Sequence, residues 1–203
     1  YMHTTGASAF FALIYLHMFR GMMYGSYQKP RELLWVLGWI TYVLLCALGF
    51  TGYVLPWGQM SFWAAQVILS LVGSIPFFGE ELLTWIRGDY LISGITLNRL
   101  FAFHVVLLPL ALIAVVFVHI LALHEVGSNN PDGVDVKKFK DDDGVPLDTK
   151  PFFPYDVMHD LYAIGVFLIF FVTIMFFYPD GGGYVIEYVN YEAADNLKTP
   201  EHI

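Results

Sequence analysis

The sequence predicts an all-α membrane protein, and three observations support that fold class. Hydrophobic residues make up 57% of the chain, whereas charged residues make up only 14%. The mean hydropathy is +0.59, which is far from a water-soluble domain and typical of a polytopic membrane protein. Four apolar segments are each long enough to cross roughly 30 Å of hydrocarbon as a helix rising about 1.5 Å per residue. We therefore expect four transmembrane helices packed as a bundle.

The four spans are separated by loops of unequal length. Pro56 ends the second span, because proline cannot continue a helix, and Pro179 with the glycines at 181–183 ends the fourth. We expect residues 1–203 to form a single membrane domain. The predicted spans cover residues 1–24, 33–55, 97–123 and 160–178.

Two loops are long enough to need their own account. The loop 58–93 contains an apolar stretch at 61–72 that is too short to span the bilayer. We expect short helices there, lying in the membrane interface. The loop 125–159 is polar and rich in Gly, Asn, Asp and Lys, which is typical of a solvated connection.

The charge and cysteine content exclude some classes of protein. The formal net charge is −8, and the chain has no basic stripe that would bind nucleic acid. The single cysteine, Cys46, lies in an apolar run, and the chain has neither a disulfide framework nor a C-x-x-C-H motif for covalent haem attachment. Any haem would therefore be held without thioether bonds. Because Tyr1 is not an initiator methionine, we expect the chain to be a fragment.

Two of the predicted spans carry histidines at matched spacing. His3 and His17 are fourteen residues apart, and His104 and His119 are fifteen apart. At about 100° and 1.5 Å per residue, each pair lies on roughly one side of its helix, separated by about 21 to 22 Å. An ionisable side chain in a spanning helix is costly, so a functional role is the default hypothesis.

Two facing helices of this kind would bring the four histidines together as two pairs stacked across the bilayer. Imidazole at both axial positions is a familiar ligation of haem iron. A single histidine could as well be a core residue satisfied by a carbonyl, but four at matched spacing favour haem. The sequence therefore predicts a di-haem four-helix bundle, with two non-covalent b-type haems.

Glycine and arginine positions support the haem hypothesis. Gly38 and Gly52 repeat the fourteen-residue spacing, and a flat macrocycle against a helix needs positions without a side chain. Close packing between membrane helices is the alternative. Arg20 and Arg99 lie within five residues of a predicted ligand, where a guanidinium can hold a haem propionate or act as a snorkelling anchor.

The basic residues predict the orientation in the membrane. Seven basic residues fall on one side of the membrane, whereas three fall on the other, namely Arg87, Arg99 and Lys198. By the positive-inside rule the larger group marks the inner side. His17 and His119 would then pair near the inner face, and His3 and His104 near the outer face. The seven are Arg20, Lys29, Arg31, Lys137, Lys138, Lys140 and Lys150.

Four motifs resemble one known family over essentially the whole chain. They are Y-M-H-T-T-G-A-S at 1–8, G-Y-V-L-P-W-G-Q-M-S-F-W at 52–63, L-N-R-L-F-A-F-H at 97–104 and H-E-V-G-S-N-N-P at 124–131. They look like cytochrome b of the respiratory cytochrome bc complex, complex III. The resemblance implies a subunit of a quinol:cytochrome c oxidoreductase that links quinol oxidation at the outer face to quinone reduction at the inner face, with proton translocation.

The resemblance also implies cofactors and partners. The low-potential haem would bind His3 and His104, with Arg99 on its propionate side. The high-potential haem would bind His17 and His119. The implied partners are the Rieske iron–sulfur protein and cytochrome c1, in a homodimeric complex that uses ubiquinone. The residues implied at the edge of the high-potential haem are Arg20, Ser26 and Trp35.

Two quinone sites follow from the same resemblance. The inner site would use His124, Ser128 and Asp160, and an imidazole and a carboxylate at the inner helix ends can hydrogen-bond quinone carbonyls and deliver protons. Of the residues implied, Tyr53, His124 and Asp160 would be catalytic. The outer site would draw on Phe50, Tyr53, Ala64 and Ile68.

The chain departs from the family pattern in three ways. The family's first membrane helix is not present before Tyr1, and the chain stops before the acidic P-E-W-Y type motif of the outer site. The fifteen-residue ligand spacing exceeds the fourteen common in respiratory forms, and a kink near Pro109 or one wide turn would absorb the extra residue. Ala64 stands where glycine is common, which predicts reduced sensitivity to strobilurin-type inhibitors. The long charged loop 132–150 favours a bacterial inner membrane over a mitochondrial one.

Two other classes stay open from the residues alone. One is a di-haem membrane anchor of a dehydrogenase or hydrogenase, although the stretch 52–63 and the loop around Ser128 argue against it. The other is a non-redox transporter that uses the four histidines as a proton relay.

Overall fold

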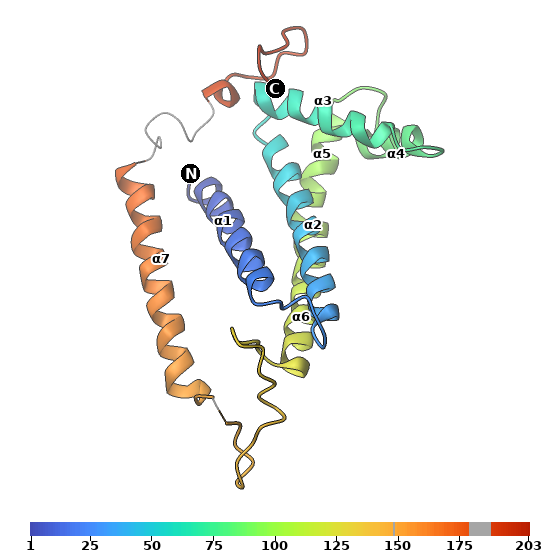
Figure 1. Cartoon of the computed structure of the whole chain (residues 1–203). Helices are drawn as coiled ribbons and strands as arrows, with labels where there is room; N and C mark the ends of the chain where they lie inside the picture. Colours follow the sequence, from blue (N-terminus) through green and yellow to red (C-terminus); the bar gives the residue numbers. More distant parts are fainter. Residues whose placement is uncertain (148, 179–187) are drawn as a thin grey trace. The chain divides into compact units, whose positions relative to one another are not determined.

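The structure, a computed structural model, describes residues 1–147, 149–178 and 188–203, and its regular secondary structure in these residues is all helical (Figure 1). Among the described residues, two isolated antiparallel β-bridges join Gly58 to Ala193 and Lys140 to Pro146. The elements are α1 (Met2–Met23), α2 (Glu32–Val54), α3 (Gln59–Gly73), α4 (Gly79–Arg87), α5 (Gly94–Ala102), the π-helix η1 (Phe103–Leu107), α6 (Leu108–Val126), the π-helix η2 (Phe152–Asp156), α7 (Val157–Phe177) and the 3-10 helix η4 (Tyr188–Tyr191).

Three stretches of helix are long and apolar enough to cross a membrane among the described residues. They are Glu32–Val54, the continuous Gly94–Val126 and Phe152–Phe177, and they overlap three of the four predicted spans, whose bounds stay predictions. Helix α1 has 22 residues but does not join them. It carries polar side chains such as His3, His17 and Arg20 among its apolar ones, and its crossing of the membrane stays a prediction.

The chain forms two compact units, each described by itself. Unit 1 comprises Tyr1–Trp35 and Leu121–Val185, and unit 2 comprises Val36–Ile120 and Ile186–Ile203. In unit 1, α1 contacts α7. The single domain predicted for residues 1–203 stays a prediction. Helix α7 ends at Phe177, next to the end predicted for the fourth span, whereas Pro179 and the glycines from which that end was predicted lie outside the described residues.

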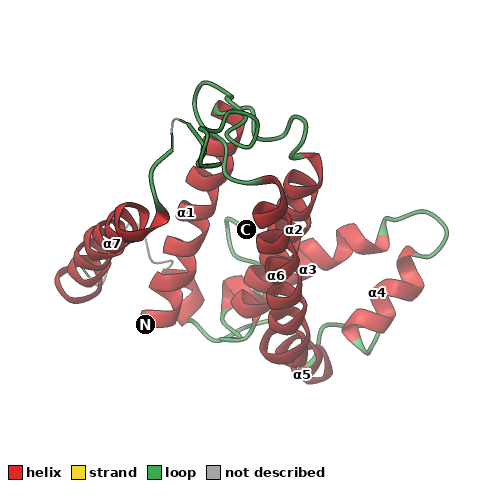
Figure 2. Ribbon diagram, turned by 90° about the horizontal axis from the view of Figure 1, so that it is seen from below, coloured by secondary structure: helices red, strands yellow, loops and turns green. Residues whose placement is uncertain are grey.

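Unit 2 places α2 alongside the continuous helix α5–η1–α6, with α3 and α4 at the end where α2 stops (Figures 1 and 2). The short helices expected in the loop 58–93 are therefore present as α3 and α4. A buried apolar cluster joins this end of α2 to α3, α4 and α5, and Ser93 and Thr96 cap α5 by a capping box. The buried cluster contains Val54, Ala65, Leu69, Leu83, Ile92 and Leu100.

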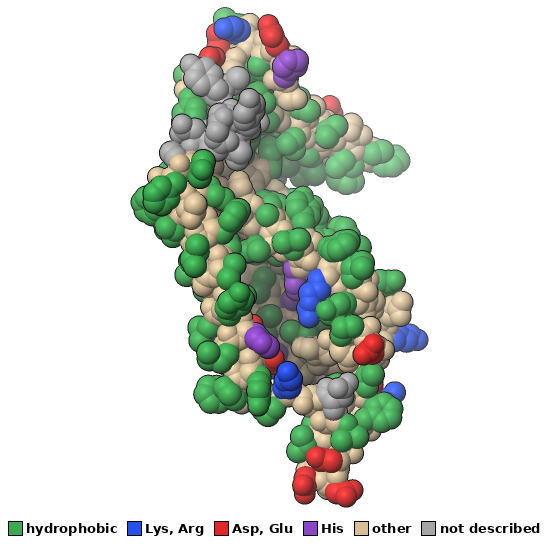
Figure 3. All heavy atoms as spheres, turned by 60° about the vertical axis from the view of Figure 1, so that its left-hand side comes forward, with side chains coloured by type: hydrophobic (Ala, Val, Ile, Leu, Met, Phe, Trp, Pro, Cys, Tyr) green, Lys and Arg blue, Asp and Glu red, His purple; other side chains and the backbone are tan. Residues whose placement is uncertain are grey.

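The long helices expose large apolar side chains along their length. Ile113 is 65% exposed, Phe117 is 64% exposed and Ile169 is 71% exposed. Figure 3 shows hydrophobic side chains spread over much of the face that it presents, among backbone and other side chains. Exposed apolar surface on this scale suits hydrocarbon as the solvent and would be unfavourable in water. The chain is therefore a multi-pass membrane protein.

Candidate functional site

One predicted haem ligand, His104, lies against α2 in unit 2. The carbonyl oxygen of Leu48 lies 2.9 Å from His104 Nδ1, and Thr51 Oγ1 lies 3.5 Å from the same nitrogen. Because a carbonyl only accepts hydrogen bonds, Nδ1 carries the proton in this contact. The lone pair of Nε2 is then the one suited to bind a metal. The hydrogen bond from Nδ1 to a carbonyl is the kind of bond that orients a metal-ligating imidazole.

The His104 ring lies so close to α2 that only glycine fits beneath it. A Cβ added to Gly52 would be 2.8 Å from His104 Nδ1 and 3.1 Å from Nε2, and it would lie closer still to Cε1. Separations under 3.0 Å are not seen for real Cβ atoms, so a side chain at this position would displace the ring. Gly52 is therefore required by the approach of His104.

His119 makes a looser version of the same contact on the same helix. A Cβ added to Gly38 would be 3.3 Å from His119 Cε1 and 3.9 Å from Nδ1. The two glycines are fourteen residues apart on α2, whereas the two histidines are fifteen apart on the facing helix. Both histidines nevertheless point at the glycine positions of α2.

The π-helix η1 explains how the two spacings match. It covers Phe103–Leu107 and includes His104, and its last bond runs from the Leu108 N–H to the carbonyl of Phe103. A π-turn takes one more residue than an α-turn, so it absorbs one residue without rotating the helix beyond it. Of the two alternatives predicted between the histidines, a kink or one wide turn, the structure has the wide turn. It keeps both histidines on the face that contacts α2.

The donor set and the glycines fit haem. Imidazole nitrogens are suitable axial ligands of haem iron, and two positions without side chains lie beside the two rings. His3 and His17 belong to unit 1, where both lie on α1 at the spacing expected for ligands. Their pairing with the histidines of unit 2 stays a prediction.

The residues predicted at the edge of the inner haem gather around the loop between α1 and α2 in unit 1. The Arg20 guanidinium carbon lies 4.8 Å from the centre of the Tyr24 ring. A Cβ on Gly21 would lie 3.3 Å from the Trp35 ring, so Trp35 packs over the end of α1. Ser26 Oγ accepts a hydrogen bond of 3.1 Å from Asn129 Nδ2.

Two residues of this region, Asn129 and Arg31, make contacts that the sequence did not predict. Asn129 Nδ2 also donates to the Tyr24 carbonyl at 2.8 Å, and Arg31 donates from Nε to the Gly127 carbonyl and from Nη2 to the Ser128 carbonyl, both at 3.1 Å. The partners lie about a hundred positions apart in sequence, so no spacing rule finds them. The one available signal was the position of Asn129 directly after a predicted site residue.

The three predicted residues of the inner quinone site belong to unit 1. His124 lies in the last turn of α6, and Ser128 follows in the loop. Asp160 lies in the first turn of α7, where the helix dipole favours a negative charge. The structure thus keeps one imidazole and one carboxylate at helix ends, as predicted. Ser128 is anchored through its carbonyl, which accepts a hydrogen bond from Arg31 Nη2.

The residues predicted for the outer site lie around the junction of α2 and α3 in unit 2. Phe50 packs against the buried cluster, and the Tyr53 carbonyl accepts a hydrogen bond of 2.6 Å from Ser61 Oγ. Ala64 and Ile68 lie on α3, one turn apart, and the Ile68 side chain is 41% exposed. The structure therefore brings the ends of these two helices together.

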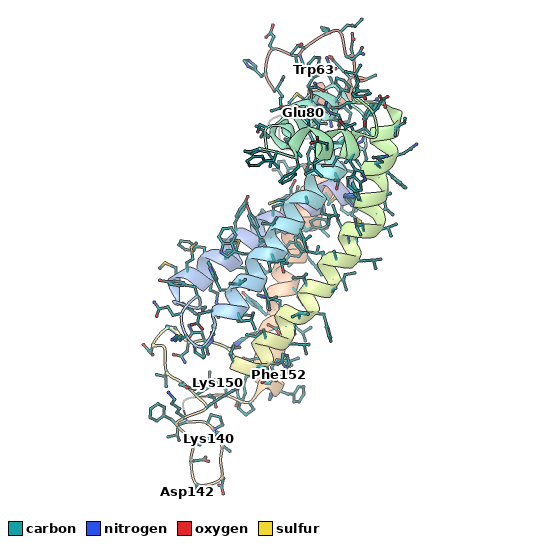
Figure 4. All side chains as sticks on the ribbon, turned by 90° about the vertical axis from the view of Figure 1, so that its right-hand side faces the viewer. Trp63, Glu80, Lys140, Asp142, Lys150 and Phe152 are labelled. Carbon is teal, nitrogen blue, oxygen red and sulfur yellow. The ribbon has the colours of Figure 1, made fainter. Side chains whose placement is uncertain are left out.

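The group that holds the start of α3 was not predicted from the sequence. Its N-cap residue, Gly58, has no side chain, and Asn190 Oδ1 instead accepts a hydrogen bond of 2.9 Å from the Ser61 amide. A Cβ on Gly58 would lie 2.9 Å from the Asn190 carbonyl carbon. Asn190 therefore caps α3 from a distant part of the chain. Trp63, labelled in Figure 4, adds a bond of 3.1 Å from Nε1 to the Asp195 carbonyl.

Arg99, predicted on the propionate side of the outer haem, packs over a turn of unit 2. Its Nη1 donates to the Trp85 carbonyl, and its Nε would lie 2.7 Å from a Cβ on Gly88. Gly88 has φ +75°, which favours glycine, so the turn leaves room for the guanidinium. The propionate contact itself stays a prediction.

The fold is that of a multi-pass helical membrane protein, and its site places His104 and His119 beside two glycines of one helix. Residues 8–182 match the family model described as cytochrome b(N-terminal)/b6/petB, and the chain belongs to this family. The resemblance seen in the four motifs is thereby confirmed. The family also argues against both the dehydrogenase anchor and the transporter.

Individual relatives agree with the family assignment. "Cytochrome b" of Allochromatium vinosum is 53% identical over 207 aligned residues, which cover 100% of this chain and 50% of that protein. "Cytochrome b/c1" of Bradyrhizobium diazoefficiens is 46% identical, over 100% of this chain and 28% of that protein. A solved structure described as "Hyperthermophilic respiratory Complex III" superposes with a TM-score of 0.86 at 36% identity, covering 99% of this chain and 52% of that one. The chain spans about half the length of the curated cytochrome b relatives named here.

Proposed function

We propose that the chain is the haem-carrying part of the cytochrome b subunit of a quinol:cytochrome c reductase. In that role it moves electrons across the membrane, between quinol oxidation at the outer face and quinone reduction at the inner face. Family membership supports this role. The observation that carries it is the alignment of His104 with Gly52 and of His119 with Gly38 along one helix.

Two non-covalent b-type haems are part of the proposal. His3 and His104 would hold one near the outer face, and His17 and His119 the other near the inner face. When bound, haem supplies reversible one-electron chemistry. The Leu48 carbonyl then keeps the proton on Nδ1 of His104 and makes Nε2 the better ligand. Arg99 would hold a propionate of the outer haem and Arg20 one of the inner haem. Ser26 and Trp35 would lie with Arg20 at the edge of the inner haem.

The inner quinone site is assigned to His124, Ser128 and Asp160. Reduction of ubiquinone to ubiquinol consumes protons as well as electrons, and an imidazole and a carboxylate are the groups that can hold and pass them. At the outer site, Tyr53 and its neighbours on α2 and α3 would orient the quinol that loses protons. Uptake inside and release outside would move charge across the bilayer. The outer site comprises Phe50, Tyr53, Ala64 and Ile68.

The proposal extends to partners and location. A Rieske iron–sulfur protein and cytochrome c1 would accept electrons from the outer site, and the complex would be a homodimer in a bacterial inner membrane. The name "Cytochrome b/c1" of one relative supports a connection to cytochrome c1. The relatives named above with their source are bacterial.

The test is the haem content of the purified complex that contains this chain, followed during a potentiometric titration. Two b-type components that titrate separately are expected. His119→Leu should remove one component and leave the other, because the two sites use different histidines. His202→Leu, which changes an exposed histidine outside the proposed sites, is the matched control and should keep both. A complex with no haem, or with one, would contradict the proposal.

A further inference from the structure

The hydrogen bonds of Arg31 in unit 1 point to a role beyond membrane orientation. Arg31 stands directly before α2, and its guanidinium donates to two consecutive carbonyls of the loop after α6: Nε to Gly127 and Nη2 to Ser128, both at 3.1 Å. The planar guanidinium presents donors in a fixed fork, so this pair of bonds sets the direction of both peptide groups. The start of α2 is thereby attached to the end of α6.

The loop after α6 is also fixed on both sides of Ser128, at Gly127 and at Asn129. The Gly127 amide donates to the Leu123 carbonyl at 2.7 Å, and Gly127 has φ +78°, which favours glycine. Asn129 Nδ2 donates to the Tyr24 carbonyl and to Ser26 Oγ. Residues 127, 128 and 129 are thus each held by hydrogen bonds, and within the described residues Arg31 is the side chain that bonds to the first two.

We propose that Arg31 is a positioning residue for the inner quinone site, which is an inference that rests on the proposed function. Arg31 fixes the backbone of Ser128, a residue assigned to that site, and so sets where the Ser128 hydroxyl points. Through the next residue, Asn129, the same segment holds Ser26, which is assigned to the edge of the inner haem. Arg31 therefore links the quinone pocket to the haem edge without touching either ligand.

The chemistry of the link makes Arg31 hard to replace. Lysine keeps the positive charge at the membrane boundary, but its single ammonium lacks the planar fork that binds two adjacent carbonyls. Glutamine removes the charge as well and offers one amide group. If Arg31 acted only as a positive-inside anchor, lysine would replace it fully, because that role depends on charge alone.

The experiment uses the assembled complex with its b haems reduced anaerobically and then mixed with decylubiquinone. The half-saturating concentration and the limiting rate of haem reoxidation are measured for Arg31→Lys, Arg31→Gln and the control Lys29→Gln. Lys29 is an exposed cation of the loop between α1 and α2, two residues before Arg31. Both Arg31 variants should raise the half-saturating concentration, by about tenfold for Arg31→Gln, with a smaller change in limiting rate. Lys29→Gln should stay within roughly twofold of the parent.

The potential of the inner haem provides the second readout. It should shift in Arg31→Gln, through Asn129 and Ser26, and not in Lys29→Gln. An Arg31→Lys complex indistinguishable from the parent in both readouts would overturn the inference and leave the proposed function standing. If Arg31→Gln does not assemble, Arg31→Lys decides alone by the same two readouts. A parent complex whose reduced haems do not respond to decylubiquinone would overturn the proposed function, and the inference with it.

Discussion

The two histidine–glycine contacts of unit 2 differ in tightness, although they repeat the same motif. At Gly52 the imidazole leaves no room for a methyl group, whereas at Gly38 a methyl group would need a shift of only a few tenths of an ångström. The tight contact lies beside the buried cluster and includes the hydrogen bond from His104 to Leu48. The loose contact lies where large apolar side chains are exposed. The histidine that approaches α2 more closely, His104, is therefore also the one whose surroundings are buried and hydrogen-bonded.

The largest expected effect comes from adding a methyl group at the tight contact. Gly52→Ala gains about 1 kcal/mol of helix propensity, but overpacking in a fixed environment costs about 1–3 kcal/mol. The His104 ring must also leave its place against α2, so the cost falls on the outer haem site. We expect roughly a tenfold loss of the outer b component, with the inner one retained. Optical titration of the variant complex measures both, and full retention of two components would refute the tight contact.

The same substitution at the loose contact should have a smaller effect. Gly38→Ala gains the same helix propensity, about 1 kcal/mol, and the required shift of the His119 ring costs a similar amount, so the two roughly cancel. Both b components should remain, with the inner one shifted in potential. A greater loss of haem from Gly38→Ala than from Gly52→Ala would reverse the comparison.

The cap on α3 gives the next effect. Asn190→Ala leaves the Ser61 amide without its acceptor and should cost about 1 kcal/mol of stability, as for other helix caps. Because the capped helix carries Ala64 and Ile68, quinol oxidation should weaken while both b haems stay. Thermal unfolding and quinol titration measure the two effects. Asn196→Ala is the control, because Asn196 is an exposed asparagine of the same segment.

The smallest structural effect should come from Ala64→Gly. Loss of one methyl group on a half-exposed turn of α3 changes stability by no more than about 1 kcal/mol. It should nevertheless increase sensitivity to strobilurin-type inhibitors, because the removed methyl group crowds a ligand packed on that backbone. Inhibitor titration of quinol oxidation in both complexes is the measurement. Equal potency would contradict the assigned role of Ala64.

Much of the fold could be read from local sequence, because apolar length and helix-ending residues act locally. The span predicted at 33–55 is α2 at Glu32–Val54, and the stretch 61–72 falls inside α3. The count of residues between His104 and His119 predicted a kink or one wide turn, and the wide turn is the π-helix η1. Helix α1 was harder, because its histidines and arginine lower its hydropathy below that of the other spans.

The candidate site also contains residues that could be predicted from local sequence and residues that could not. Ligand and glycine positions repeat along a helix, so their period is visible in the sequence. The bonds of Arg31, Asn129 and Asn190 connect segments that are far apart in the chain, and nothing in their own neighbourhoods encodes the partner. Side chains that hold loops in place are therefore found only once the backbone is known.

The most direct test of the account is haem content after changing the length of η1 by one residue. Deleting Val106 should convert the π-turn into an α-turn and leave His104 and His119 on the same face, so both b components should be retained. Inserting one alanine after Val106 should rotate one histidine by about 100° from its glycine and abolish a component. Loss of haem from the deletion, together with two intact components after the insertion, would contradict the role assigned to η1.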